Sequence, residues 1–245
     1  MHGGRMRILL INPNTSAHVT DLVARHVRTQ LDGRAELRAV TGRFGARYIA
    51  SRAAAAIAGH AALDALAEHG ADCDAVYLAC FGDPGLLALR ELSRVPVVGM
   101  AEAACHEAAA RGRFGIVTGG AAWESMLREF VAALGLSDAL AALRTVAPSG
   151  GAIASDPDAA LAMLVEACRA CVASGSETVI LGGAGLAGLA TLIAPQVPVP
   201  IICSVEAGTR AVLAAAGRSD SAWFKPDPVE SVGLAPALAA RLMDS

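Results

Sequence analysis

The chain has 245 residues and a formal net charge of −3, with acidic and basic residues interspersed along its length. This balance provides no basic surface for nucleic acid or an anionic membrane, so the expected partner is a small molecule. Hydrophobic residues make up 54% of the sequence and aromatic residues 4%, a composition that excludes a disordered chain and is typical of Ala-rich helices packed on aliphatic strands.

The predicted elements begin with a buried strand at Arg7–Ile11, followed by the turn residues 12–16 and a helix from about Ala17. Ala-rich helical patterns then alternate with short aliphatic segments. This alternation predicts βαβ units, a mainly parallel sheet and an α/β fold. The further strands are predicted at Leu37–Thr41, Ala75–Cys80, Val95–Gly99, Phe114–Thr118, Thr178–Leu181 and Pro200–Ser204.

A weak internal repeat relates the two halves of the sequence. RILLINPNTS is echoed by RFGIVTGGAA, AVYLACFGDPGL by TVILGGAGLAGL, and PVVGMAEAA by PIICSVEAG. We therefore predict two pseudosymmetric α/β lobes, each a mainly parallel sheet flanked by helices, with a ligand site between them at the carboxyl ends of the strands. The first lobe is predicted to comprise residues 1–100 plus 206–245, and the second residues 101–205.

Several features bear on the compartment of the protein. Charge, His or Gly interrupts every apolar run well before the roughly 18 residues that a membrane-spanning helix needs. The N-terminal MHGGRMRILLINPN has too short an apolar run for a signal peptide. Six cysteines without regular spacing are interpreted as reduced thiols. We expect a cytoplasmic protein that contacts no membrane and no nucleic acid. We also expect a homo-oligomer, only because homo-oligomers are common among soluble enzymes.

Cys80 is the first candidate for chemistry. It ends a predicted strand and precedes the turn-rich segment 81–85, which leads into a predicted helix. Backbone N–H groups and the positive end of the helix dipole are expected to lower the pKa of a thiol at such a junction. Spacing alone supports a buried structural cysteine equally well.

Polar and glycine-rich turns follow the equivalent strands. Asn12 and the residues after it offer amide, hydroxyl and backbone donors to a carboxylate or imide, although helix capping explains such residues as well. The segments 118–120 and 182–185 place glycines where backbone N–H groups approach an anion closely.

Other motifs are set aside. Cys168 and Cys171 form a C-x-x-C inside a helical pattern with no second pair at metal-ligand spacing, and packing explains them better. His60, His69 and His106 are interpreted as surface residues. The sequence has neither the glycine pattern of a dinucleotide site nor that of a P-loop, so neither kind of site is predicted.

Taken together, LINPNTS, YLACFGDPGLLALREL, VPVVGMAEAA and VILGGAGLAGLA resemble hydantoin racemases, which belong to the aspartate/glutamate racemase superfamily. The resemblance extends over nearly the whole chain, and ACFGDPGL is its most specific part. It implies an isomerase without cofactor or metal, in which the substrate lies between two lobes with one thiol on each face. One thiolate removes the proton from the stereogenic carbon and the opposite thiol supplies another.

The resemblance also implies the site residues. Cys80 corresponds to one catalytic thiol of the family. The segment RYIASRAAAA, which begins at Arg47, is weakly similar to the stretch that faces the substrate in the family. The substrate-binding residues that it implies are Asn12, Tyr48, Ser51, Phe81, Gly82, Thr118, Gly119, Gly183, Ala184 and Gly185.

The sequence departs from the family pattern at Gly183, where the second thiol is expected. Water, Asp83, Cys203 or another acid would have to replace it. Three hypotheses follow: a racemase or epimerase of 5-substituted hydantoins or related amino-acid derivatives, a decarboxylase or isomerase that uses one thiol, and a ligand-binding relative without turnover.

Overall fold

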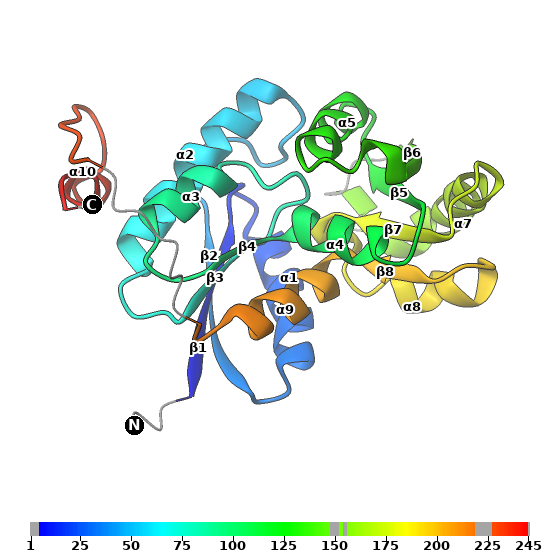
Figure 1. The fold of residues 1–245 in the computed structure, drawn as a ribbon, viewed down its shortest axis with the longest axis horizontal. Helices are drawn as coiled ribbons and strands as arrows, with labels where there is room; N and C mark the ends of the chain where they lie inside the picture. Colours follow the sequence, from blue (N-terminus) through cyan, green and yellow to red (C-terminus); the bar gives the residue numbers. More distant parts are fainter. Residues whose placement is uncertain (1–4, 148–151, 154–155, 219–226, 245) are drawn as a thin grey trace.

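Two four-stranded parallel sheets form the centre of the molecule (Figure 1). The computed structural model describes residues 5–147, 152–153, 156–218 and 227–244. Its strands are β1 (Met6–Asn12), β2 (Ala35–Thr41), β3 (Ala75–Leu78), β4 (Val97–Gly99), β5 (Phe114–Gly119), β6 (Leu140–Val146), β7 (Thr178–Gly182) and β8 (Ile201–Cys203). The first sheet has the order β2-β1-β3-β4 and the second the order β6-β5-β7-β8.

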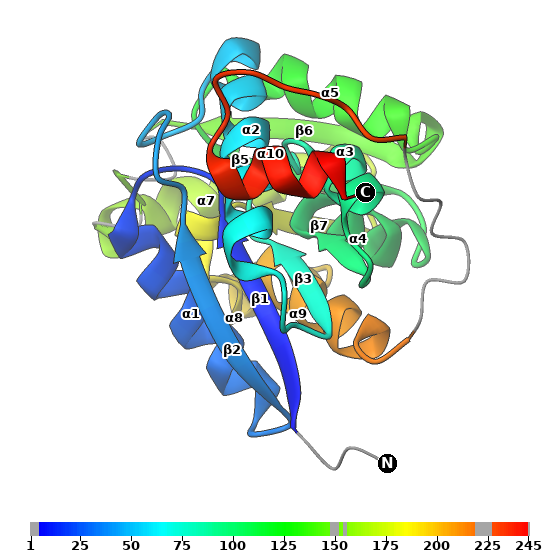
Figure 2. The same ribbon diagram turned by 90° about the vertical axis from the view of Figure 1, so that its left-hand side faces the viewer.

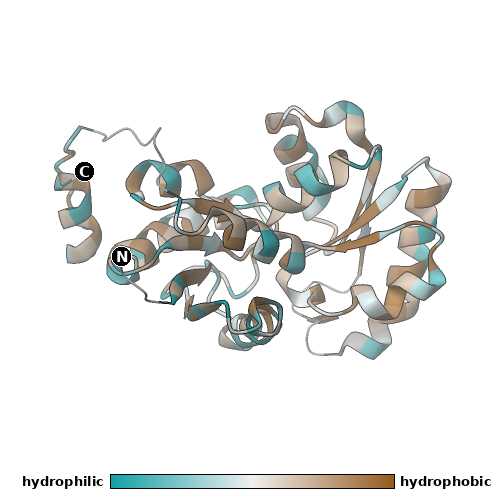
Figure 3. Cartoon of the chain, turned by 60° about the horizontal axis from the view of Figure 1, so that its bottom comes forward, coloured by the Kyte–Doolittle hydropathy of each residue, from teal (hydrophilic) through white to brown (hydrophobic). Residues whose placement is uncertain are grey.

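The two sheets therefore repeat one arrangement, as the internal sequence repeat predicts. Every neighbouring pair of strands is parallel, so the predicted α/β fold with two similar halves is confirmed. The strands β3, β5 and β7 are buried at every position, because helices cover parallel sheets on both faces. Figure 3 shows hydrophobic residues along the strands and hydrophilic residues scattered over the helices.

Helices follow most strands, as the sequence pattern predicts. The α-helices of the described residues are α1 (Ala17–Leu31), α2 (Arg52–His69), α3 (Leu86–Leu92), α4 (Met100–Ala109), α5 (Trp123–Ala133), α7 (Pro157–Ala173), α8 (Ala190–Ile193), α9 (Ser204–Ala215) and α10 (Pro236–Met243). The described part of the chain also forms the short 3₁₀ helices η1 (Ser137–Ala139), η2 (Ala184–Leu186) and η3 (Ala194–Gln196).

The helices pack against the sheets in layers. In the first half α1 and α9 contact the strands and each other, whereas α2 and α3 form a second apolar cluster with β1 and β4, to which α10 adds Leu238. Figure 2 shows α10 lying over α2. In the second half α7 contacts β5, β6 and β7, and α8 contacts β8.

Two helices cross between the halves. The helix α4 follows β4 of the first sheet but also contacts β7 and β8 of the second, and α9 follows β8 but contacts β3 and β4. These two helices also pack against each other. The predicted boundaries of the two lobes, at residues 101 and 206, fall within these exchanged helices and stay a prediction.

The sequence prediction missed β6. Its sequence, LAALRTV, begins with Ala and Leu, which favour helices, so local propensity gave no strand signal. The segment forms a strand because it pairs in parallel with β5. Cys168 and Cys171 are buried within α7, and the six cysteines form no disulfide. Among the described residues, no helix combines the length and apolarity needed to cross a membrane.

We predict that Gly208→Ala destabilises the packing of α9 on β3. Tyr77 of β3 is fully buried, and its hydroxyl donates a hydrogen bond to the carbonyl of Val205 at 3.1 Å. A Cβ at position 208 would overlap the Tyr77 ring. We expect the free energy of unfolding, measured by urea denaturation, to fall by about 1–3 kcal/mol. Because alanine otherwise favours a helix interior by about 1 kcal/mol, an unchanged or increased stability would contradict this packing.

Candidate active site

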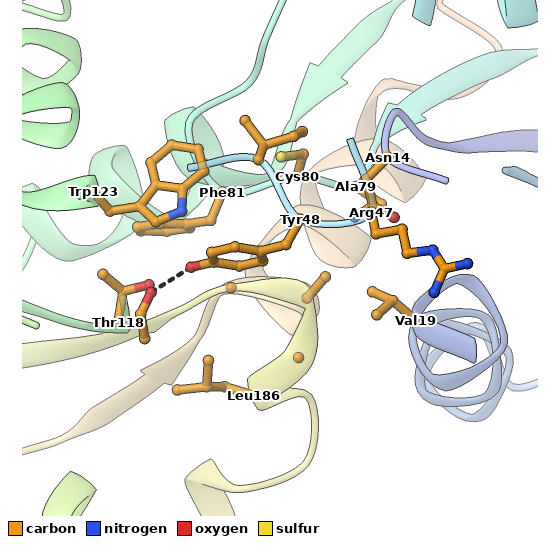
Figure 4. A pocket seen from close by; sticks show the side chains of 15 residues that line it. Asn14, Val19, Arg47, Tyr48, Ala79, Cys80, Phe81, Thr118, Trp123 and Leu186 are labelled. Carbon is orange, nitrogen blue, oxygen red and sulfur yellow. Dashed lines mark hydrogen bonds between the residues drawn. The ribbon is translucent and has the colours of Figure 1, made fainter. Parts of the chain in front are cut away.

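A cavity lies between the two halves, at the carboxyl ends of β1, β2, β3, β5 and β7 (Figure 4). About 540 Å³ of space lies between its lining residues, part of it open to solvent. Its walls are mostly apolar and aromatic. Eight of the residues predicted from the sequence line it: Tyr48, Cys80, Phe81, Thr118, Gly119, Gly183, Ala184 and Gly185.

Three predicted residues do not line this cavity. The Asn12 side chain is fully buried below it, where its amide donates to the side chains of Asn14 and Thr20. Ser51 caps α2, because its hydroxyl accepts a hydrogen bond from the N–H of Ala54 at 3.1 Å. Gly82 has a positive φ of 123° and packs beneath Trp123. Local structure accounts for these three residues, and a contact with substrate stays a prediction.

Cys80 follows β3 by two residues and places its thiol at the wall of the cavity (Figure 4). The residue is 7% exposed. The expectation of a lowered pKa is wrong: burial, followed by the negative charge of Asp83, raises the pKa of this thiol. The reason is that the junction is desolvated, which penalises the thiolate more than nearby dipoles favour it. The thiol is therefore protonated in the free protein at neutral pH.

Asp83 is the buried acid beside this junction. Its carboxylate accepts hydrogen bonds from the backbone N–H groups of Ala101 and Glu102, at 3.0 and 2.8 Å, and so caps α4. Burial raises the pKa of Asp83 to about 7, against these two hydrogen bonds, which lower it. Because its oxygens point at α4 and it does not line the cavity, Asp83 influences Cys80 through its charge.

The facing wall comes from the second sheet. Thr118 and Gly119 end β5, and Gly183 follows β7 with a φ of 134°. The Gly183 N–H donates to the hydroxyl of Ser204 at 3.1 Å. Among the described residues, none accepts a hydrogen bond from the N–H groups of Ala184 or Gly185, which begin η2 at the cavity. This wall therefore offers backbone donors but no thiol.

Aromatic residues join the two walls. Tyr48 lies in the segment between β2 and α2, and its hydroxyl donates to the carbonyl of Gly119 at 2.7 Å. Phe81 packs on Gly182 of β7, where a Cβ would overlap the ring. Figure 4 shows Trp123 and Phe81 on one side of the Tyr48 ring. These contacts connect the two walls of the cavity.

The sequence reasoning missed several residues of the cavity. Trp123 begins α5 and carries no motif, so its place follows only from the way β5 ends. Arg47 lies beside the predicted Tyr48 and extends its guanidinium along the edge of the cavity (Figure 4). The residues that were missed are Val19, Arg47, Ile49, Ala79, Trp123 and Leu186, whereas Asn14, which also lines the cavity, belongs to the polar turn that the sequence indicated.

The suggested replacements for a second thiol are separate from the cavity. Cys203 ends β8, is 4% exposed and does not line the cavity, and burial raises its pKa. The described residues contain no group of three or more His, Cys, Asp or Glu side chains that could hold a metal ion.

The amino-acid sequence that forms this site matches a known family. The model of the Asp/Glu/Hydantoin racemase family matches residues 8–212. The chain belongs to this family. It is therefore an isomerase of the racemase type.

Individual racemases extend this similarity over most of the chain. A hydantoin racemase from Paenarthrobacter aurescens is 36% identical over 211 residues, which cover 84% of this chain and 89% of the relative. The structure of an allantoin racemase from Klebsiella pneumoniae is 32% identical with a TM-score of 0.83, covering 93% of this chain and 97% of that one. An allantoin racemase from Pseudomonas fluorescens is 28% identical with a TM-score of 0.86, covering 93% and 100%.

Proposed function

We propose that this racemase inverts the configuration at C5 of 5-substituted hydantoins or closely related amino-acid derivatives. The observation that carries the proposal is the thiol of Cys80, which lies at the wall of a cavity lined by both halves of the chain. The similar racemases are named for hydantoin and allantoin, and allantoin is itself a hydantoin with a ureido substituent at C5. The shared ring is therefore the proposed recognition element.

The reaction needs no cofactor, because the ring carbonyl next to C5 turns the carbanion into an enolate. The thiolate of Cys80 takes the C5 proton, and negative charge develops on the carbonyl oxygen. Ala184 and Gly185 line the cavity, and their N–H groups have no acceptor among the described residues. Donors that are already in place stabilise such charge strongly in a site with little water.

A second candidate function rests on Gly183. A glycine at the second thiol position leaves Cys80 as the one thiol in the cavity lining, which favours chemistry that protonates a single face, such as decarboxylation. The proposed racemisation requires a further proton carrier on the opposite wall.

The deciding experiment follows single enantiomers in deuterated water. The substrate is D- or L-5-isobutylhydantoin, or one enantiomer of allantoin. We expect its solution to lose optical rotation, and the product enantiomer that forms to carry deuterium at C5. Exchange with complete retention would favour one-sided chemistry. Binding without exchange or product, for every hydantoin tested, would refute the proposed racemisation and favour a protein without turnover.

The proposal extends to the setting of the enzyme. The substrate is a small molecule, and the near-neutral charge balance supports the absence of nucleic-acid and membrane partners. A cytoplasmic location and a homo-oligomer are part of the proposal. Sedimentation of the purified protein tests the oligomer, since a monomer at all concentrations would refute it.

A further inference from the structure

Inversion at C5 requires proton transfer at both faces of the substrate, and among the described residues that line the cavity only Cys80 carries a thiol. Gly183 has no side chain, and the polar atom closest to a Cβ built there is the hydroxyl oxygen of Thr118, at 3.7 Å. An alcohol such as threonine is a very weak acid in water. The wall facing Cys80 therefore needs another group that can give and take a proton.

Besides Cys80, the described residues that line the cavity include one group that can give and take a proton. Among them, only Arg47, Tyr48 and Cys80 have titratable side chains. An arginine does not lose its proton in proteins, so Arg47 cannot act as a base. Apart from Cys80, the phenol of Tyr48 is the group in the lining that can both donate and accept a proton.

The Tyr48 hydroxyl lies at the wall of the cavity that has no thiol. The residue belongs to the segment after β2 of the first sheet, but its hydroxyl is bonded to Gly119, at the end of β5 in the second sheet. The parallel register pairs Thr118 with Gly182, so Gly119 lies next to Gly183 along the same edge. The phenolic oxygen is thus held at the wall that carries Gly183, whereas Cys80 comes from the first sheet (Figure 4).

Glycine at position 120 makes this arrangement possible. A Cβ there would approach the Tyr48 hydroxyl oxygen to 2.6 Å, and the residue has a φ of 90°, which favours glycine. The hydroxyl donates to a carbonyl, a contact that requires the protonated phenol and keeps a transferable proton at the cavity. Rotation about the bond between the ring and the oxygen redirects that proton towards a bound substrate.

We propose that Tyr48 is the second catalytic acid and base, acting on the face of C5 opposite Cys80. This inference rests on the proposed racemisation. In one direction the Cys80 thiolate takes the C5 proton, and the Tyr48 O–H bond breaks as its proton forms a new C–H bond on the other face of the enolate. A thiol and a phenolate result. The reverse reaction uses the phenolate as base and the thiol as acid, so protons and charge balance in each direction.

The test compares Tyr48→Phe with Tyr77→Phe, which alters the other tyrosine of the sequence. Tyr77 is buried against α9 and does not line the cavity. Both enantiomers of 5-isobutylhydantoin and of allantoin are incubated separately in deuterated water, and circular dichroism checks folding. We expect Tyr48→Phe to lower kcat for racemisation by roughly 10²–10⁴-fold while one enantiomer still exchanges its C5 proton with retention. Tyr77→Phe is expected to keep racemisation within about threefold of wild type.

Two results would overturn the role of Tyr48. One is racemisation by Tyr48→Phe at the wild-type rate. The other is a folded Tyr48→Phe variant that loses exchange of both enantiomers together, since that pattern assigns Tyr48 to binding. If the wild-type protein itself neither exchanges nor inverts these hydantoins, the proposed function fails, and the role of Tyr48 fails with it.

Discussion

Replacing Cys80 by serine is expected to lower kcat for hydantoin racemisation by roughly 10²–10⁴-fold without loss of the fold. Serine nearly preserves the volume of the buried side chain, which is 7% exposed, so the walls of the cavity should keep their positions. Its hydroxyl, however, is a far weaker acid than a thiol and supplies almost no anion to remove the C5 proton. Polarimetry measures the rate, and circular dichroism with thermal unfolding measures the fold.

The matched control is Cys73→Ser. Cys73 is half-buried, donates its S–H to the carbonyl of Gly70 and does not line the cavity. We expect this variant to racemise hydantoins at the wild-type rate. Cys80→Ser should also lose the proton exchange that Tyr48→Phe retains, because that exchange depends on the Cys80 thiolate. Wild-type turnover by a folded Cys80→Ser variant would remove Cys80 from the mechanism.

The sequence predicted the fold well because its signals were local and repeated. Turn residues after Ile11 and glycines after Thr118 marked where strands end, and alternation with helices made the sheets parallel. The strand β6 was missed because its Ala and Leu residues favour a helix, and only pairing with β5 makes it a strand.

The site was harder to predict than the fold where its properties depend on packing between residues that are distant in sequence. The place of Cys80 follows from the end of a strand, but the pKa of its thiol depends on desolvation by residues distant in sequence. Trp123 reaches the cavity because α5 begins directly beyond β5, and no motif marks it. Asn12 was expected to bind substrate, yet its amide is used within the turn after β1.

The rate of racemisation should rise with pH through the neutral and mildly alkaline range. The Cys80 thiol has a raised pKa, so nearly all of the free enzyme holds the thiol rather than the thiolate at pH 7. The fraction of thiolate increases about tenfold per pH unit below the pKa. We therefore expect kcat/KM to keep rising from pH 6 to pH 9, by up to about tenfold per unit, without a plateau near the ordinary thiol pKa. A profile that is flat above pH 7 would contradict a buried, protonated thiol.

Asp83→Asn tests the electrostatic part of this shift. The charge of Asp83 is the second cause of the raised Cys80 pKa after burial, so a neutral amide should lower that pKa and increase kcat/KM. Because the pKa of Asp83 is itself raised to about 7, its carboxyl is neutral at low pH and charged at high pH. The variant and wild type should therefore have similar kcat/KM at pH 5.5, and the variant should be faster at pH 8.5.

Asp83→Asn should also lower the stability of the fold, and this effect is measured separately from the change in the Cys80 pKa. An amide accepts only one of the two N–H bonds that Asp83 receives from Ala101 and Glu102, so the free energy of unfolding should fall by about 1–3 kcal/mol. Glu102→Gln is the control, because it removes a nearby carboxylate that pairs with Arg90 and is not a cause of the Cys80 shift. An Asp83→Asn profile that is parallel to wild type from pH 5.5 to 8.5 would show that burial alone sets the acidity of the catalytic thiol.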